Sequence, residues 1–340
     1  MLELAREVLA GEEAWIVGGA VRDELLGRPV VDLDIACADP ERAARAYAAA
    51  SGGAPFRLSA AHGGWRVALD GGRTVDFTPL HGSIEDDLAT RDFTINAIAR
   101  PLAGGEHVDP FGGRVDLETG TVRAVGADVF ENDPLRLLRA VRFEEELAFA
   151  IERRTERLVR EQAELVTRPA GERILEVLLR LDIPGWSRLG ELGLLQPLGG
   201  SLELADRAGA VDSPEYRLVV FLQDSIGLLP ISRDLRRFAV ALLRSSPPSD
   251  SSPRSLHRFR RGTEPWAAEA LAFHGRLDLA SALDESRASD PAEPLLRGDE
   301  LGLPEGPEVG ALLELIAEER AAGMISTRKE ALELVRRHSR

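Results

Sequence analysis

The spacing of apolar residues changes partway along this chain of 340 residues. Up to about residue 125, short apolar runs alternate with turn residues, a pattern typical of strands mixed with helices. From Pro134 onward, apolar side chains such as Leu135, Leu138 and Val141 recur at helical spacing. The change predicts an α/β unit at the N-terminus, a small mixed sheet with helices, followed by an all-α remainder.

The first part of the chain carries local strand and helix signals. Strands are predicted at residues 14–17, 30–36, 65–69 and 74–77. The last two flank the turn Asp70-Gly71-Gly72 and therefore predict a hairpin. Helices are predicted at residues 20–26, before Gly27, and after the N-cap signal Asp39-Pro40, through an alanine-rich stretch that ends at Gly52.

One segment of the helical part has a different composition. Residues 245–261, SSPPSDSSPRSLHRFRR, are rich in serine and proline and then become basic. This composition predicts an exposed loop that enters a helix. A linker and an RNA contact are both compatible with it.

Composition restricts the class of protein. No run approaches the ~18 consecutive apolar residues of a membrane helix, and the N-terminus lacks a signal-peptide layout, so we expect a cytoplasmic protein with no membrane partner. The single cysteine, Cys37, excludes a disulfide framework and a cysteine-rich zinc site. The net charge of −15 argues against a basic coat for nonspecific nucleic-acid binding, although it does not exclude RNA.

A pair of carboxylates lies on one predicted strand. In PVVDLDIA, Asp32 and Asp34 share one face, while Val31, Leu33 and Ile35 share the other. The two carboxylates are ~7 Å apart along a strand, which allows both to bridge the two metal ions of phosphoryl transfer. Oxygen ligands favour Mg²⁺. The alternative is a solvated strand face or turn.

The residues before this pair form a glycine turn. Gly18-Gly19 follows a predicted strand and opens a helix, so backbone N–H groups could cradle a triphosphate beside Arg22. Joined to Asp-x-Asp on the next strand, the segment resembles the DNA polymerase β-like nucleotidyltransferases. More narrowly, GGAVRDELLG with DLDIA resembles the class II tRNA nucleotidyltransferase and bacterial poly(A) polymerase family. The resemblance continues through RDFTINAIA (91–99), DPFGGRVDLETGTVRAVG (109–126), FENDPLRLLRAVRF (130–143) and ERILEVLLRL (172–181).

The resemblance implies an architecture and an activity. It implies a catalytic head over residues 1–125, a helical neck with a nucleobase-reading motif over 126–200, and a helical body and tail over 201–340 that bind tRNA. The implied enzyme extends the 3′ end of tRNA without a template and releases pyrophosphate. Asp32 and Asp34 would bind Mg²⁺, with Asp76 as a plausible third carboxylate or, equally, a solvent-facing strand residue.

The resemblance also assigns residues to the nucleotide. Arg91 would contact the triphosphate, and Asp92 and Asn96 the sugar or supporting hydrogen bonds. Without the family, residues 92–99 would be only a helix start with a capping residue. The family has a second arginine where this chain has Thr90.

The segment NDPLRLLRAVR carries the base-reading motif. Asp133, Arg136, Arg139 and Arg142 lie three residues apart on a drifting helix face. By resemblance, Arg136 donates to O2 and N3 of cytosine and Asp133 accepts from its amine, whereas Arg139 and Arg142 reach phosphate or backbone. The alternative is an N-cap at Asp133 before exposed arginines. Asn132 stands where the family has glutamate.

Four functions remain open at this stage. CCA-adding relatives have a flexible loop between the strand matching residues 74–77 and the motif matching Arg91. Here only fourteen residues separate Asp76 from Arg91, and they predict a tight turn into a helix with Ser83 as N-cap. We therefore expect an enzyme that adds CC from CTP. The alternatives are a CCA-adding enzyme using CTP and ATP, a poly(A) polymerase, and a non-catalytic RNA-binding protein.

Overall fold

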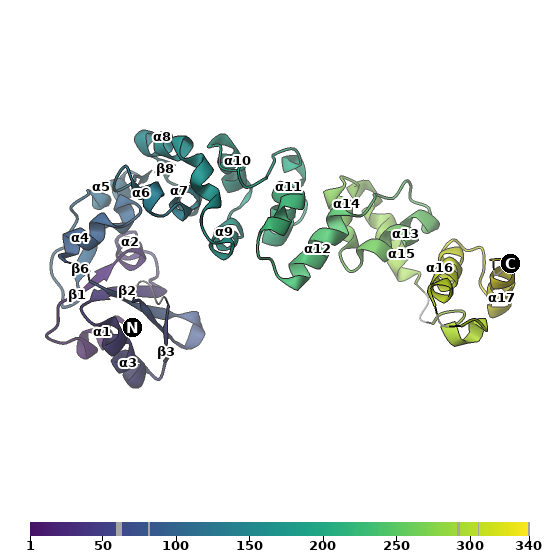
Figure 1. Cartoon of the computed structure of the whole chain (residues 1–340), viewed down its shortest axis with the longest axis horizontal. Coiled ribbons are helices and arrows are strands. Elements are labelled where there is room, and N and C mark those ends of the chain that lie inside the picture. The colour runs from purple at the N-terminus through teal and green to yellow at the C-terminus, as the bar shows by residue number, and fades with distance from the viewer. Residues whose placement is uncertain (59–62, 81, 291–292, 305, 339–340) are drawn as a thin grey trace. The chain divides into compact units, whose positions relative to one another are not determined.

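The computed structural model describes residues 1–58, 63–80, 82–290, 293–304 and 306–338 (Figure 1). The chain divides into two compact units, Met1–Leu198 and Gly199–Arg340. The first contains the sheet and the helices around it, and the second is helical (Figure 1). Among the described residues, no helix is long and apolar enough to cross a membrane. The α/β unit followed by a helical remainder agrees with the predicted fold class.

A six-stranded sheet organises the N-terminal part of the first unit. Its order is β3-β4-β5-β2-β1-β6, and only β2 and β5 pair in parallel, so the described sheet is mixed. The strands are β1 (Ala14–Val17), β2 (Asp32–Cys37), β3 (Ala54–Arg57), β4 (Trp65–Ala68), β5 (Thr74–Pro79) and β6 (Ala99–Pro101). The antiparallel pairing of β4 with β5 confirms the predicted hairpin.

The alternation along β2 separates core from polar residues. Leu33 and Ile35 are buried, as their place in the pattern predicts. Val31 was predicted to share this face, but the strand begins only at Asp32 and Val31 is 52% exposed. In the register with β5, Asp34 lies beside Asp76 and Asp32 beside Thr74. The sheet therefore gathers polar side chains from neighbouring strands on one face.

Two helices of the first unit, α3 and α4, begin at the N-cap signals that the sequence carries. Asp39 caps α3 (Pro40–Ser51) by accepting from the N–H of Arg42, and Gly52 ends it with a φ of 75°. Ser83 and Asp86 form a capping box at the start of α4 (Ile84–Ala89), which confirms the predicted N-cap. The other helices are α1 (Leu2–Val8), α2 (Gly19–Leu25), α5 (Gly113–Glu118), α6 (Val129–Asn132), α7 (Leu135–Leu147), α8 (Arg153–Glu161), α9 (Gly171–Leu178) and α10 (Ile183–Glu191).

The segment around Asp92 departs from the local pattern. Instead of a helix start over residues 92–99, the structure has a 3₁₀ turn, Thr94–Asn96, followed by β6. Asp92 accepts from the N–H of its neighbour Phe93 and from the side chains of Asn96 and the distant Arg139, so it does not cap a helix. Tertiary hydrogen bonds therefore override the local helix signal here.

An aromatic cluster joins this turn to the helix α7. Phe93 packs edge-on against Phe143, with ring centroids 5.8 Å apart, and its ring centroid lies 6.5 Å from that of Phe130. All three side chains are buried. Because Phe143 lies on α7, this contact fixes the polar face of that helix against residues 91–96.

Gly113, at the start of α5, permits a close backbone contact. A Cβ at this position would lie 2.1 Å from the carbonyl oxygen of Thr94 and 2.8 Å from the Cγ1 of Ile98. We expect Gly113→Ala to lower the free energy of unfolding by at least ~2 kcal/mol, because the backbone must move. Gly64→Ala, where the nearest atoms are 3.9 Å away, is the control. Equal urea midpoints for the two variants would contradict this expectation.

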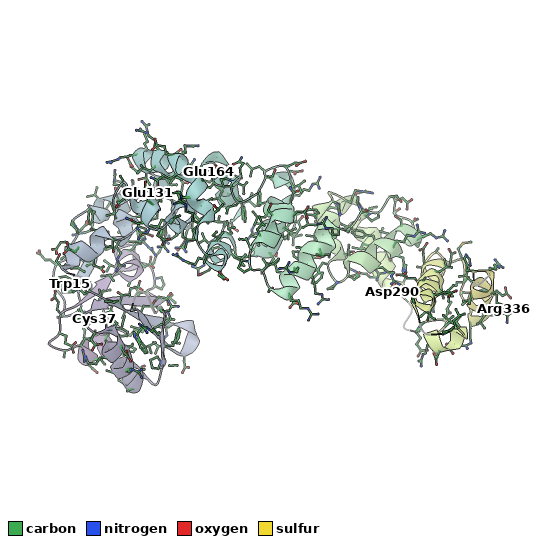
Figure 2. The ribbon with its side chains drawn as sticks, viewed as in Figure 1. Trp15, Cys37, Glu131, Glu164, Asp290 and Arg336 are labelled. Atoms are coloured by element: carbon green, nitrogen blue, oxygen red, sulfur yellow. The ribbon has the colours of Figure 1, made fainter. Side chains whose placement is uncertain are left out.

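The single cysteine is part of the core of the first unit (Figure 2). Cys37 is buried at the end of β2 and forms no disulfide. Burial raises the pKa of its thiol to about 11. The thiol is therefore protonated and unreactive at neutral pH.

The described part of the second unit consists of α-helices and short 3₁₀ helices joined by turns and loops. The α-helices are α11 (Pro214–Leu222), α12 (Arg233–Leu243), α13 (Pro253–Thr263), α14 (Ala267–Phe273), α15 (Ala280–Ala288), α16 (Pro307–Ala321) and α17 (Arg328–His338). A hydrophobic cluster made by Leu312 and Ile316 of α16 with Ala331 and Val335 of α17 holds the last two helices together.

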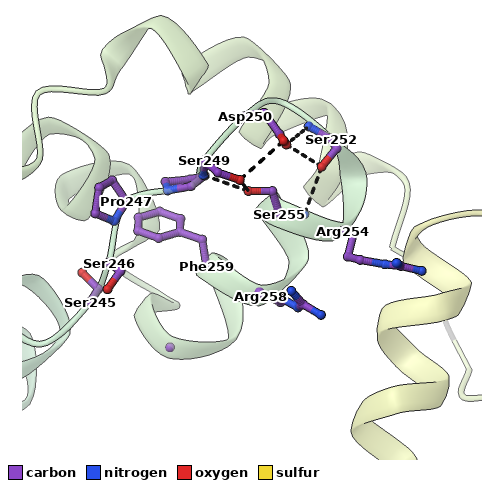
Figure 3. Close-up of a pocket in the computed structure, with 12 residues that line it drawn as sticks. Ser245, Ser246, Pro247, Ser249, Asp250, Ser252, Arg254, Ser255, Arg258 and Phe259 are labelled. Atoms are coloured by element: carbon purple, nitrogen blue, oxygen red, sulfur yellow. Dashed lines mark hydrogen bonds between the residues drawn. The ribbon is translucent and has the colours of Figure 1, made fainter.

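The serine-rich segment enters α13 as the sequence predicts. Ser252 caps the helix by accepting from the N–H of Ser255. A cavity of about 540 Å³ lies at this end, lined by serines, Arg254 and Arg258 (Figure 3). Both arginines pair with Glu318 of α16, and Arg254 also pairs with Glu319. Acidic partners thus compensate the basic charge of this segment.

Candidate active site

A cavity of about 970 Å³ in the first unit brings together the residues singled out by sequence. It is lined by every predicted site residue: Gly18, Gly19, Arg22, Asp32, Asp34, Asp76, Arg91, Asp92, Asn96, Asp133, Arg136, Arg139 and Arg142. The cavity also includes Arg66, Asp87, Arg173, Glu176 and Arg180, which the sequence analysis did not identify.

The carboxylate pair on β2 is electrostatically unequal. Asp32 is exposed and accepts a hydrogen bond of 2.8 Å from the hydroxyl of Thr74. Asp34 is partly covered; burial and the neighbouring charges of Asp76 and Asp32 raise its pKa to about 6. Burial first, and nearby negative charge second, therefore disfavour the ionised carboxylate of Asp34, and a cation bound there would favour it.

The third predicted carboxylate already has a partner. Asp76 accepts two hydrogen bonds of 2.7 Å from Nε and Nη2 of Arg66, its register neighbour on β4. This bidentate pair compensates much of the charge of Asp76. Among the described residues, no group of three or more His, Cys, Asp or Glu side chains could hold a metal ion. Because Arg66 binds both oxygens of Asp76, Asp32 and Asp34 are the carboxylates of this strand pair that are better placed to hold a metal.

Gly18 leaves room for the guanidinium of Arg91 beside the acidic strand β2. Its φ is 66°, and a Cβ would lie 2.9 Å from Nη1 of Arg91 and 3.4 Å from Oδ2 of Asp34. Arg91 is held from its other side by Asp87, one helical turn earlier, at 2.9 Å. A side chain at position 18 would therefore displace Arg91 from the cavity wall.

Asp92 is the centre of a buried hydrogen-bond network. It accepts from Nε of Arg139 at 2.7 Å and from the amide of Asn96 at 3.0 Å. Asn96 in turn accepts from Nη1 of Arg22 at 2.9 Å. Burial raises the pKa of Asp92, but Arg139, Asn96 and the N–H of Phe93 outweigh it and hold the pKa below its usual range. The network fixes two cavity arginines.

Three arginines surround one aromatic ring at the cavity. The guanidinium carbons of Arg22, Arg139 and Arg142 lie 5.3, 5.1 and 4.7 Å from the centroid of Phe143. The buried Nε of Arg142 has no hydrogen-bond partner within the described ranges. Burial and the charge of Arg139 lower the pKa of Arg142 to about 10. Such a cluster of cations favours an anionic ligand.

Asp133 and Arg136, the two residues to which the resemblance assigns base reading, are held by different groups. Asp133 accepts from the N–H of Leu135 at 3.2 Å, the bond expected of an N-cap, and from Arg173 at 2.8 and 3.3 Å. It therefore has the N-cap bond and also faces the cavity. Asn132 donates to Asp128.

Backbone oxygens hold the arginine of the motif. Arg136 donates to the carbonyls of Thr90, Arg91 and Val129 at 2.7, 3.3 and 3.4 Å. These carbonyls do not depend on the side chain at position 90, so threonine there leaves the support of Arg136 intact.

The cavity residues that were not predicted from the sequence differ in whether a local pattern indicates them. Arg66 faces Asp76 across the predicted hairpin, and Asp87 precedes Arg91 by four residues after the predicted N-cap. Both could have been found from local spacing. Arg173 is 40 residues from Asp133, so only the packing of α9 on α7 reveals that pair.

Comparisons with known proteins identify the family of the chain. The family model of the poly(A) polymerase head domain matches residues 14–68 and 54–123. The chain is 33% identical to the CC-adding tRNA nucleotidyltransferase of Geobacter sulfurreducens, over 94% of this chain and 91% of the relative. It is also 33% identical to the A-adding tRNA nucleotidyltransferase of Deinococcus radiodurans, over 95% of each chain.

A solved structure extends the similarity to the whole fold. The Bacillus stearothermophilus CCA-adding enzyme in complex with CTP matches with a TM-score of 0.73 and 27% identity, over 99% of this chain and 96% of that chain. The expectation of an enzyme, drawn from the sequence motifs, is confirmed by these relatives. The chain belongs to the family of tRNA nucleotidyltransferases.

Proposed function

We propose that this chain transfers cytidylate from CTP to the 3′ end of tRNA and stops after two additions. Relatives named as CC-adding, A-adding and CCA-adding enzymes support tRNA as the substrate. Solved CCA-adding enzymes have been observed with tRNA, with ATP and with CTP. The observation that carries the choice of cytidine is the hydrogen-bonding capacity left on Asp133 and Arg136.

The free donors and acceptors of this pair can be counted. Of the five N–H donors of Arg136, three bind carbonyls, which leaves Nε–H and one Nη2–H. Of the roughly four acceptor sites of the Asp133 carboxylate, three are occupied by Leu135 and Arg173. Two donors and one acceptor remain, which match O2, N3 and the amine of cytosine. Uracil would place a carbonyl against the carboxylate.

The short connection before α4 supports a stop after CC. A purine places its pairing edge farther from the sugar than a pyrimidine does, so reading adenine would require the pair to move. Only residues 80–83 join β5 to α4, and the Ser83–Asp86 capping box closes the turn. The connection is too short to form a flexible loop that could move Asp133 and Arg136.

The carboxylates of β2 fit a divalent metal. Burial, and then the charges of Asp76 and Asp32, raise the pKa of Asp34, so a cation at this carboxylate would favour its ionised form, and Asp32 offers an exposed carboxylate on the same face. We propose that these two residues hold Mg²⁺. When bound, Mg²⁺ would promote attack by the RNA 3′-hydroxyl and neutralise the departing pyrophosphate.

The cavity arginines are the proposed triphosphate ligands. Arg22, Arg139 and Arg142 share the ring of Phe143, and Arg91 lies beside Gly18. Their fixed positions would orient the α-phosphorus toward the RNA end, because charge compensation needs little rearrangement during transfer.

We propose a separate role for each of three segments of the chain. Residues 1–125 form the catalytic head, residues 126–200 the neck that reads the base, and residues 201–340 the body and tail that bind tRNA. The compact division between Leu198 and Gly199 is consistent with this assignment.

Asp133→Ala is expected to reduce the preference for CTP over UTP by ~5- to 100-fold, because one base-edge contact contributes ~1–3 kcal/mol to discrimination. The measurement is kcat/KM for each nucleotide with tRNA that ends at the discriminator base. If Asp133 acted only as an N-cap, unfolding would become easier while the ratio stayed unchanged.

The proposed activity is tested with transcripts that end at the discriminator base, at C or at CC. CTP alone should extend the first by two residues and the second by one, with stoichiometric release of pyrophosphate. Binding of tRNA without pyrophosphate release would instead indicate a non-catalytic RNA-binding protein. Long adenosine tracts made from ATP on any RNA end would indicate a poly(A) polymerase.

A further inference from the structure

We infer that Arg173 is a positioning residue for base selection, because its guanidinium holds the Asp133 carboxylate in the orientation that leaves one acceptor for the nucleotide. This inference rests on the proposed role of Asp133 in reading cytosine. It assigns a function to a residue on α9, outside the motif that carries Asp133.

The contact has the geometry of a clamp. Nη1 of Arg173 lies 3.3 Å from Oδ1 of Asp133, and Nη2 lies 2.8 Å from Oδ2. Each terminal nitrogen of the guanidinium therefore donates to a different oxygen of the carboxylate, which makes the pair bidentate. The N–H of Leu135 adds a third bond, to Oδ1. Together these donors restrict rotation of the carboxylate about its Cβ–Cγ bond.

The packing of α9 fixes the position of the clamp. Arg173 lies in the first turn of α9, whose side chains Ile174, Val177 and Leu178 are buried. This helix contacts α7, which begins directly after the Asp133-Pro134 pair. The backbone of Arg173 therefore has a defined place relative to Asp133, although the two residues are 40 apart in sequence.

Arg173 determines how many acceptor sites of the Asp133 carboxylate remain free for the nucleotide. With Arg173 present, Oδ2 retains about one site toward the cavity. Without it, only Leu135 would hold the carboxylate, which could then rotate and admit water between itself and the base. A bridging water can donate to the O4 of uracil as well as accept from the amine of cytosine. Loss of Arg173 should therefore weaken the rejection of UTP.

The exposure of the pair separates this role from a structural one. The side chain of Arg173 is 52% exposed and that of Asp133 28%. Ion pairs with this degree of exposure contribute little to folding, because water and salt screen them. Removing Arg173 should leave unfolding nearly unchanged while it alters nucleotide choice.

The test compares Arg173→Ala and Arg173→Lys with wild type in the full chain. We expect Arg173→Ala to lower the ratio of kcat/KM for CTP to that for UTP by ~10-fold on tRNA ending at the discriminator base. Arg173→Lys, which keeps the charge without the planar fork, should have an intermediate ratio. Arg157→Ala, an exposed arginine of α8 outside the cavity lining, is the matched control and should keep the wild-type ratio.

A double variant tests whether Arg173 acts through Asp133. Asp133→Ala with Arg173→Ala should have the same ratio as Asp133→Ala alone. A further fall in the double variant, or an unchanged ratio in Arg173→Ala, would overturn the inference. Addition of adenosine by wild type would contradict the CC-only function but leave this comparison valid, because the ratio measures cytosine against uracil.

Discussion

Asp34→Asn is expected to lower nucleotide addition by at least ~10³-fold while it stabilises the metal-free protein above pH 6. The loss follows if Asp34 holds the catalytic metal, because metal ions contribute several kcal/mol of charge stabilisation in the transition state, and ~4 kcal/mol corresponds to ~10³-fold. The assay is single-turnover addition of cytidine at saturating Mg²⁺. Activity within tenfold of wild type would remove Asp34 from the proposed machinery.

The stability change has a defined dependence on pH. Burial, Asp76 and Asp32 raise the pKa of Asp34 from 3.8 to about 6. The folded state therefore binds a proton more tightly than the unfolded state, and stability falls as pH rises from about 4 to 6. Above pH 6 the ionised carboxylate lowers the free energy of unfolding by its full amount, ~1–3 kcal/mol. The upper value applies to a fully buried carboxylate.

Chemical unfolding in EDTA measures this penalty. Asp34→Asn should raise the urea midpoint at pH 8, and the gain should shrink toward pH 4. Mg²⁺ should stabilise wild type more than the variant. Asp70→Asn, an exposed aspartate near the β4–β5 turn, should leave the midpoint unchanged at both pH values. A midpoint for Asp34→Asn that does not rise at pH 8 would contradict the raised pKa of Asp34.

Asp92→Ala is expected to lower the free energy of unfolding by ~3–5 kcal/mol, because it leaves buried donors and the charge of Arg139 without their acceptor. Asp92 is 6% exposed and accepts from Arg139, Asn96 and Phe93. Its pKa is lowered on folding, so the carboxylate stabilises the fold above the unfolded pKa of 3.8. That stability is lost as the pH falls through the lower folded value.

Urea unfolding at pH 7 measures the effect of Asp92. Asp92→Asn keeps one acceptor oxygen and should cost less than Asp92→Ala. The cost of Asp92→Ala should also be smaller on an Arg139→Ala background, since the two side chains interact directly. A cost below ~1 kcal/mol at pH 7 would show that other groups or water satisfy Arg139 and Asn96.

Local signals predicted much of the fold. The strand Ala14–Val17, the capped helix after Asp39 and the N-cap at Ser83 depend on interactions within a few residues, so the sequence is sufficient to identify them. The prediction for Val31 was wrong because alternation indicates which face a residue would take but not where the strand begins.

The candidate site was predictable by residue type but not by partner. The resemblance to a known family identified Asp34, Asp92 and Arg136, which line one cavity. The sequence could not show that Asp92 binds Arg139, 47 residues away, or that carbonyls hold Arg136. Such pairs depend on how α7 packs against residues 91–96 through the contact of Phe93 with Phe143. No local pattern in the sequence reveals that packing.

The number of nucleotides added is tested most directly with purified chain, tRNA ending in CC, ATP and Mg²⁺, in a parallel series with tRNA ending in C and CTP. The second reaction shows that the preparation is active. The short β5–α4 connection and the fixed Asp133–Arg136 pair predict one cytidine added in the second reaction and no adenosine in the first. Efficient addition of a terminal adenosine by the chain alone would contradict the proposal that it adds only CC.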